Sequence, residues 1–187
     1  TSNAVAERAV RTTLRGTSSL LRRAGLHVQW WPYAMRCFAC LWNFFGGIQS
    51  REGEQAHNTP WIMRFRKGPF KGLLVPFGAL VEYVPNKRME KKYPKFEGKK
   101  RWGIFLGYKT YAGGYWGKSY LVADIKDFND IEGSRVTIQD TPDIFFDIKK
   151  NPLKCPLKEH FDKIAQSPGY SGGTTRVEIV LDKGIDA

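Results

Sequence analysis

The range 99–108 constrains the fold of this chain more than any other stretch. Three cations, at 99–101, lead directly into the run Trp-Gly-Ile-Phe-Leu-Gly-Tyr. A short, continuous apolar run bounded by turn residues is typical of a buried β-strand. Its two glycines, Gly103 and Gly107, allow the close backbone approach or the bulge that bends a strand. These residues therefore predict a curved sheet with a basic edge.

Positive charge is concentrated around the same strand. The chain has 187 residues with 30 Lys/Arg and 18 Asp/Glu, and residues 60–110 hold thirteen of the cations but only three acids. Such a block is typical of a surface that binds a polyanion, although a solvated, solubilising face is the alternative. The candidate nucleic-acid-binding residues in the loop before the strand are Lys91, Lys92, Lys95, Lys99, Lys100 and Arg101.

Composition also bounds the setting of the protein. Three cysteines do not make a disulfide framework, which indicates a reducing compartment. The most apolar stretch, 30–45, is interrupted by Arg36 and Asn43 and is shorter than the ~18–20 residues of a membrane span. No charged-then-apolar leader opens the chain, and its first residue is Thr1 rather than Met. We therefore expect an intracellular fragment of a longer protein, with no membrane partner.

An amphipathic helix is predicted from Ser2 or Asn3 to about Arg23. Its apolar residues form one stripe and its arginines another, and Glu7 lies where the two stripes meet. The simplest interpretation is a solvent-facing helix in which Glu7 pairs with Arg11, worth ~0.2–0.5 kcal/mol. That interpretation does not explain why one carboxylate stands among several arginines. The arginines of this stripe are Arg8, Arg11, Arg15 and Arg22.

A second helix is predicted from Pro32 to Phe45, because proline suits the first helical position. Its side chains are apolar almost all round. Such a helix must be buried between other elements, and this sequence offers few partners for it. We therefore expect it to belong to a larger core, most of which lies upstream of this chain.

Two short motifs resemble known sites but lack the context that those sites need. Cys37 and Cys40 form a C-x-x-C on the second helix, without a βαβ setting or a second pair of zinc ligands, so buried small residues are favoured. Residues 112–119 read A-G-G-Y-W-G-K-S, close to a phosphate-binding loop. A strand pattern, rather than a helix, follows this motif, so we interpret it as the turn of a β-hairpin.

Short strands are expected on both sides of the central run. We expect strands within 73–75, 77–84, 104–108, 119–124 and 135–138, the last of which is a candidate to close the sheet. This pattern predicts an α+β chain in which helices at 1–46 and a linker at 47–60 precede a small antiparallel β-barrel at 61–148. The tail at 149–187 has weak periodicity, apart from a possible strand at 177–181, and receives no role.

Several of these segments resemble a known family, in the order that the family has them. Residues 3–8, 11–14 and 30–34 are similar to the end of the integrase catalytic core of copia-type LTR retrotransposons. Residues 75–79, 103–108 and 120–122 are similar to the Src-homology-three-like barrel that follows that core. The resemblance covers roughly residues 1 to 147, although Ala4 stands where the family usually has glycine.

The resemblance implies a fold and a chemistry. The two N-terminal helices would be the end of a truncated ribonuclease-H-like core, whose Asp-Asp-Glu triad holds two Mg²⁺ or Mn²⁺ ions. The glutamate of the family's N-x-x-x-E-R pattern matches Glu7, which would be both a catalytic residue and a metal ligand. Arg8, Arg11 and Arg15 would contact the phosphate backbone. Both aspartates are missing here, so the fragment alone is expected to bind no metal and to be inactive.

The sequence thus predicts the C-terminal fragment of a retrotransposon integrase, a polynucleotidyl transferase when intact. Its candidate partners are DNA, the rest of the integrase core and, for the intact protein, further copies of itself. The nucleus is the expected site of integration. Two alternatives stay open. One is a non-catalytic nucleic-acid-binding module, and the other is a protein-interaction barrel whose basic loop meets an acidic partner.

Overall fold

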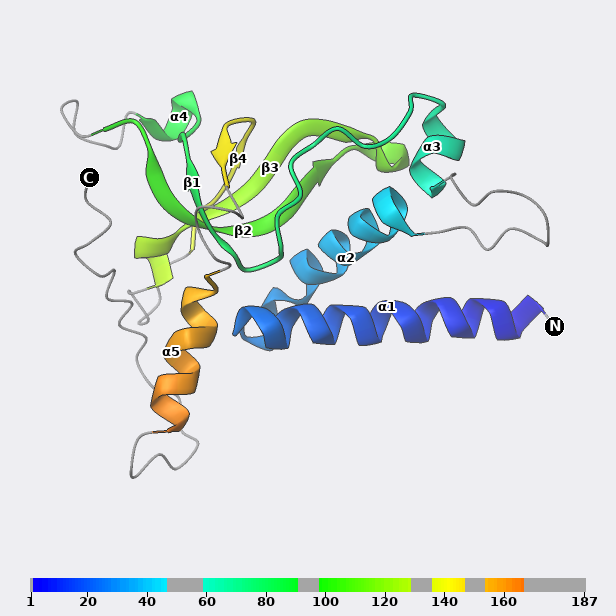
Figure 1. Ribbon diagram of the computed structural model, residues 1–187, viewed down its shortest axis with the longest axis horizontal. Helices are drawn as coiled ribbons and strands as arrows, with labels where there is room; N and C mark the ends of the chain where they lie inside the picture. Colours follow the sequence, from blue (N-terminus) through cyan, green and yellow to red (C-terminus); the bar gives the residue numbers. More distant parts are fainter. Residues whose placement is uncertain (1, 47–58, 91–97, 129–135, 147–153, 167–187) are drawn as a thin grey trace.

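The computed structural model describes residues 2–46, 59–90, 98–128, 136–146 and 154–166. Within these ranges the chain has an α+β fold, as predicted, in which helices lie beside a five-stranded antiparallel sheet (Figure 1). The helices are α1 (Ser2–Ala24), α2 (Trp31–Phe45), α3 (Pro60–Phe65), α4 (Lys87–Glu90) and α5 (Pro156–Ala165). The strands are β1 (Leu80–Tyr83), β2 (Arg101–Thr110), β3 (Trp116–Asp124), β4 (Ile138–Thr141) and β5 (Ile144–Phe145).

The first two helices form where the sequence predicts them. The last turn of α1 contains two arginines. Gly25 follows the helix with φ +66°, a conformation that glycine adopts without a Cβ penalty. After a short 3-10 turn (Val28–Trp30), α2 begins with proline in its first turn. None of the helices in the described ranges is long and apolar enough to cross a membrane.

β2 is the central strand of the sheet, which confirms the prediction from the range 99–108. The strand order is β4-β3-β2-β1-β5, and all neighbouring strands are antiparallel. The pairing of β2 with β3 shifts register between Phe105 and Gly107, and Gly107 has φ +127°. The expected bulge is therefore present. The segment that resembles a phosphate loop is the hairpin turn between β2 and β3, also as predicted.

The sheet is open in the described residues, since no ladder joins its two edge strands. β4 and β5 lie at opposite edges, although only residues 142 and 143 separate them in the chain. The Thr141 hydroxyl donates to the carbonyl of Val84 (2.7 Å), and the Val84 N–H donates to the carbonyl of Asp143 (3.0 Å). The sheet must therefore curl strongly enough to bring its edges together here.

Within the described residues, one face of α2 packs against the sheet. Its buried side chains are Ala34, Cys37, Cys40 and Phe44, which form one stripe. Phe44 stacks on Phe70 with ring centroids 3.7 Å apart and meets the Tyr108 ring edge-on at 5.1 Å. Trp31, Trp42 and Phe45 are about half exposed, so the described residues bury only part of α2, and the larger upstream core stays a prediction.

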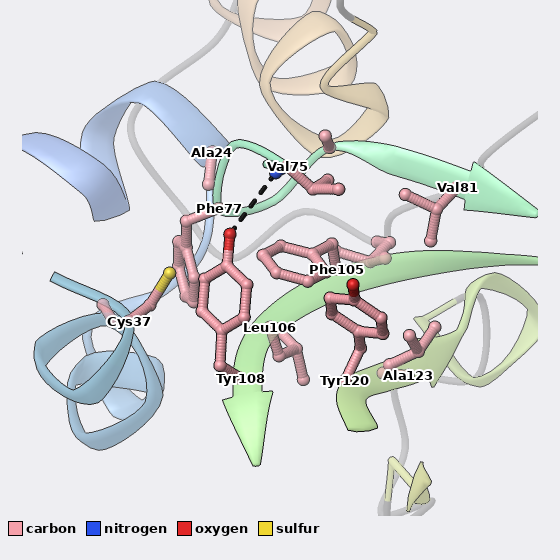
Figure 2. Packing of buried hydrophobic residues seen from close by; sticks show 14 of the residues in the cluster. Ala24, Cys37, Val75, Phe77, Val81, Phe105, Leu106, Tyr108, Tyr120 and Ala123 are labelled. Carbon is pink, nitrogen blue, oxygen red and sulfur yellow. Dashed lines mark hydrogen bonds between the residues drawn. The ribbon is translucent and has the colours of Figure 1, made fainter. Parts of the chain in front are cut away.

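The segment 73–75 is not the strand that its apolar residues suggested. Figure 2 shows the Tyr108 side chain rising from β2 toward this segment. The Tyr108 hydroxyl accepts from the Val75 N–H (3.5 Å) and donates to the Leu73 carbonyl (3.2 Å), while the Tyr120 hydroxyl accepts from the Leu73 N–H (2.8 Å). Two tyrosine hydroxyls therefore form the hydrogen bonds that these backbone groups would form with a neighbouring strand.

Residues 154–166 of the tail have a defined structure, which their weak periodicity did not predict. α5 packs at the C-terminal end of α1, where a Cβ on Gly25 would overlap the backbone of Lys158. Leu157 of α5 is buried, and the carbonyl of Lys154 accepts from the Leu80 N–H at 2.9 Å. The possible strand at 177–181 lies outside the described residues.

The two cysteines of α2 have the properties of core residues, as predicted. Burial raises the pKa of both thiols, that of Cys40 to about 11, and both face the sheet side of the helix. Because the thiolate is the reactive form, we expect slow alkylation of native protein at pH 8 and fast alkylation in denaturant. Mass spectrometry of iodoacetamide-treated protein checks this. Rapid native labelling of Cys37 would contradict the packing of α2 on β2.

Candidate nucleic-acid interface

Glu7 and its neighbouring arginines lie on one exposed face of α1. The helix carries them at i, i+1, i+4 and i+8, spacings that keep them within about one third of the helix circumference. The side chains of Glu7, Arg8, Arg11 and Arg15 are all exposed, and they line a shallow hollow of about 340 Å³ on the surface of this one helix. The structure therefore brings together the predicted carboxylate and its predicted phosphate-binding residues.

These four side chains make no ion pair with one another or with any other described residue. The pairs found in the described ranges are Lys100–Glu82, Lys109–Asp140 and Lys158–Asp162. The simple interpretation of Glu7 as the partner of Arg11 is thus not the arrangement adopted. The face presents one negative and three positive groups to whatever covers it.

The described residues do not by themselves form a Mg²⁺ site. No three His, Cys, Asp or Glu side chains converge in the described ranges. Glu7 offers one exposed carboxylate, whereas Mg²⁺ requires a nearly octahedral shell of oxygen ligands. Any metal held at this face would therefore need ligands from outside these ranges, and we derive no catalytic step through it.

The second predicted set, the basic loop, is only partly described. Lys91, Lys92 and Lys95 lie outside the described residues. Lys99 and Lys100 are exposed just before β2, and Arg101 is half-buried at its first position. The Lys100 ammonium lies 3.2 Å from the Glu82 carboxylate and 4.1 Å from the centre of the Phe145 ring. The start of β2 therefore carries the described members of the predicted basic set, and Lys100 is already paired with Glu82.

The two predicted sets are far apart. The start of α1 and the start of β2 lie at opposite ends of the molecule along its longest axis (Figure 1). A single short contact cannot use both sets, so a ligand that touches both must be long. Duplex DNA, with its regular phosphates, meets that condition.

Sequence reasoning missed a third group of cations, on α3 and on the hairpin between β2 and β3. The signal was present, because residues 61–67 read W-I-M-R-F-R-K, which combines large apolar and basic side chains. The sequence predicts no helix at 60–65, so this run counts there only as part of the charge excess of 60–110.

No protein-family model, curated protein or solved structure matches the chain.

Proposed function

We propose that the chain is the C-terminal part of a copia-type retrotransposon integrase that binds DNA. In this proposal α1 and α2 are the end of the ribonuclease-H-like core, and the curled antiparallel sheet is the Src-homology-three-like barrel that follows it. The intact protein would carry out metal-dependent strand transfer in the nucleus. Its proposed partners are DNA, the rest of the core and further copies of itself.

The observation that supports this proposal most is the arrangement on α1. On an ordinary surface helix, a glutamate four residues before an arginine can pair with it and stabilise the helix by ~0.2–0.5 kcal/mol. Glu7 instead lies exposed beside Arg8, Arg11 and Arg15, without an ion pair in the described residues. Such a face suits a site where the arginines hold a phosphate backbone close to a carboxylate that the reaction requires.

Each group of residues has a separate part in this proposal. The arginines of α1 and the cations before β2 hold phosphates at two points along the duplex, which fixes its position without reading its sequence. Glu7 supplies one carboxylate to the catalytic centre, and the two aspartates of the family come from upstream. The chain described here is inactive on its own because it carries one member of the triad.

The DNA-binding part can be tested through its salt dependence. With about six phosphate contacts, a plot of log K against log[salt] should have a slope of about −5. Replacing Lys99, Lys100 and Arg101 together by glutamine should flatten the slope by about 3, since each lost contact removes ~0.9. Fluorescence anisotropy with a labelled duplex of arbitrary sequence measures both values.

A matched control has the same loss of charge elsewhere. Lys126, Lys154 and Lys163 are exposed residues outside the predicted loop, and replacing all three by glutamine changes the net charge equally. This variant should keep the slope within about one unit of the original. Equal flattening in both variants, or a flat salt dependence in the unmodified chain, would count against DNA binding at the start of β2 and favour a protein partner.

A further inference from the structure

The tip of the hairpin between β2 and β3 and the neighbouring α3 form a second surface rich in cations and aromatic rings. This surface, called here the hairpin–α3 surface, is separate from the face of α1 and from the start of β2. Its defining residues are Arg64, Arg66, Lys67, Tyr111, Tyr115 and Lys118, all of them exposed.

Ring contacts hold the two elements together. The Phe65 ring of α3 meets the Tyr115 ring of the hairpin edge-on, with centroids 5.9 Å apart and planes at 74°. The Lys67 ammonium lies 5.3 Å from the centre of the same Tyr115 ring. A Cβ on Gly113, at the turn, would lie 3.7 Å from the Arg64 guanidinium. Cations from one element therefore lie directly beside aromatic rings from the other.

The positive charge of this surface is not neutralised within the described residues. Arg64, Arg66, Lys67 and Lys118 have no acidic partner within ion-pair distance there. The nearby Asp140 is already paired with Lys109, and this contact lowers the pKa of Asp140 and raises that of Lys109. The surface thus presents an excess of free cations at neutral pH.

A hollow of about 470 Å³ lies between α3 and the turn of the hairpin. Trp61, Met63 and Phe65 give it apolar walls, and Arg64 places a cation at its side. The turn contributes Gly113 and Gly114, whose positive φ values of +79° and +77° fix the tight loop and whose lack of side chains leaves the hollow open. A flat apolar group with a negative charge attached to it matches both the shape and the charge.

Single-stranded nucleic acid has this chemistry. Tyr111 and Tyr115 are 56% and 39% exposed, so part of each ring is free for stacking. Unpaired bases stack on such rings, whereas in a duplex the base faces are already covered. An acidic peptide would use the cations but not the rings. We propose that the hairpin–α3 surface binds unpaired nucleotides, with bases on the tyrosines and in the hollow and phosphates on Arg64, Lys67 and Lys118.

This inference does not depend on Glu7 or on the basic loop, so it can fail or succeed independently of the proposed function. The test compares a labelled 15-nucleotide oligothymidylate with a 15-base-pair duplex in anisotropy titrations of the full chain. Replacing both Tyr111 and Tyr115 by leucine keeps apolar bulk but removes the stacking rings. We expect the affinity for the single strand to fall about tenfold per ring and that for the duplex to stay within twofold.

The control is Trp31→Leu, which removes an aromatic ring that is 49% exposed at the N-terminal end of α2. This variant should leave both affinities unchanged. Photocrosslinking of the unmodified chain to an oligonucleotide with 5-iodouracil supplies a readout that needs no variant, and the crosslinks should map to 111–115. Equal losses for both ligands, no loss for either, or crosslinks elsewhere would overturn the proposal. Polyglutamate tests the acidic-protein alternative. If it displaces the oligonucleotide equally well from the unmodified chain and from the leucine variant, the tyrosine rings take no part in binding, and the surface would be assigned to acidic proteins.

Discussion

In the longer protein that the proposed function requires, Glu7→Gln should abolish most strand-transfer activity. Glutamine keeps the size and helix propensity of the side chain but removes the negative charge that a divalent cation needs. Because such a cation supplies several kcal/mol of transition-state stabilisation, the expected loss is at least about a hundredfold. A strand-transfer assay with labelled DNA ends and Mg²⁺ measures it.

DNA binding by the same variant should be unchanged or slightly tighter, since an anion has been removed from a face with three arginines. Glu159→Gln is the matched control, because it makes the same chemical change at an exposed position of α5. That control should leave strand transfer intact. Normal, metal-dependent strand transfer by the Glu7→Gln protein would falsify the catalytic assignment, and it would not affect the proposal that the start of β2 binds DNA.

The sequence predicts those elements whose patterns are local. An apolar run between turn residues predicts β2. Two stripes of side chains and the glycine that ends the helix predict α1. The hairpin turn at 112–119 was recognisable because a strand pattern, not a helix, follows it. In each case the residues that decide the structure are neighbours in the chain.

The elements that were missed depend on partners far away in the sequence. The backbone of 73–75 is bound by hydroxyls from Tyr108 and Tyr120, more than thirty residues later, so its apolar character gave a false strand. The partners of α2 likewise include sheet residues about sixty to seventy positions onward, among them Gly107, whose lack of a side chain lets Cys37 approach. No local pattern shows such contacts.

The candidate site follows the same rule. The face of α1 is contiguous along one helix, so helical spacing was enough to place Glu7 beside Arg8, Arg11 and Arg15. The hairpin–α3 surface combines residues from 64–67 and 111–118, which only the fold brings together. Aromatic and basic residues in both segments were visible, but nothing in the sequence showed that they meet.

Gly78→Ala should destabilise the protein more than an ordinary glycine substitution, because α1 packs directly on this residue. Gly78 has φ +80°, and an added Cβ would overlap the Cβ of Ala24 and lie 2.9 Å from its Cα. The left-handed conformation costs alanine roughly 1–2 kcal/mol, and overpacking adds roughly 1–3 kcal/mol. We expect a loss of about 3 kcal/mol or more in the free energy of unfolding, measured by urea denaturation.

Gly68→Ala separates the two contributions. Gly68 has φ +73°, nearly the same conformation, but an added Cβ would meet nothing within 4 Å. Its cost should therefore be the backbone term alone, roughly 1–2 kcal/mol. Adding Ala24→Gly to the Gly78→Ala protein should recover part of the difference, with a coupling free energy of about 1 kcal/mol in the double-mutant cycle. Equal losses of unfolding free energy for the two glycine variants, with no coupling to residue 24, would show that α1 does not pack on the loop before β1. The description of one core shared by the helices and the sheet would then be incorrect.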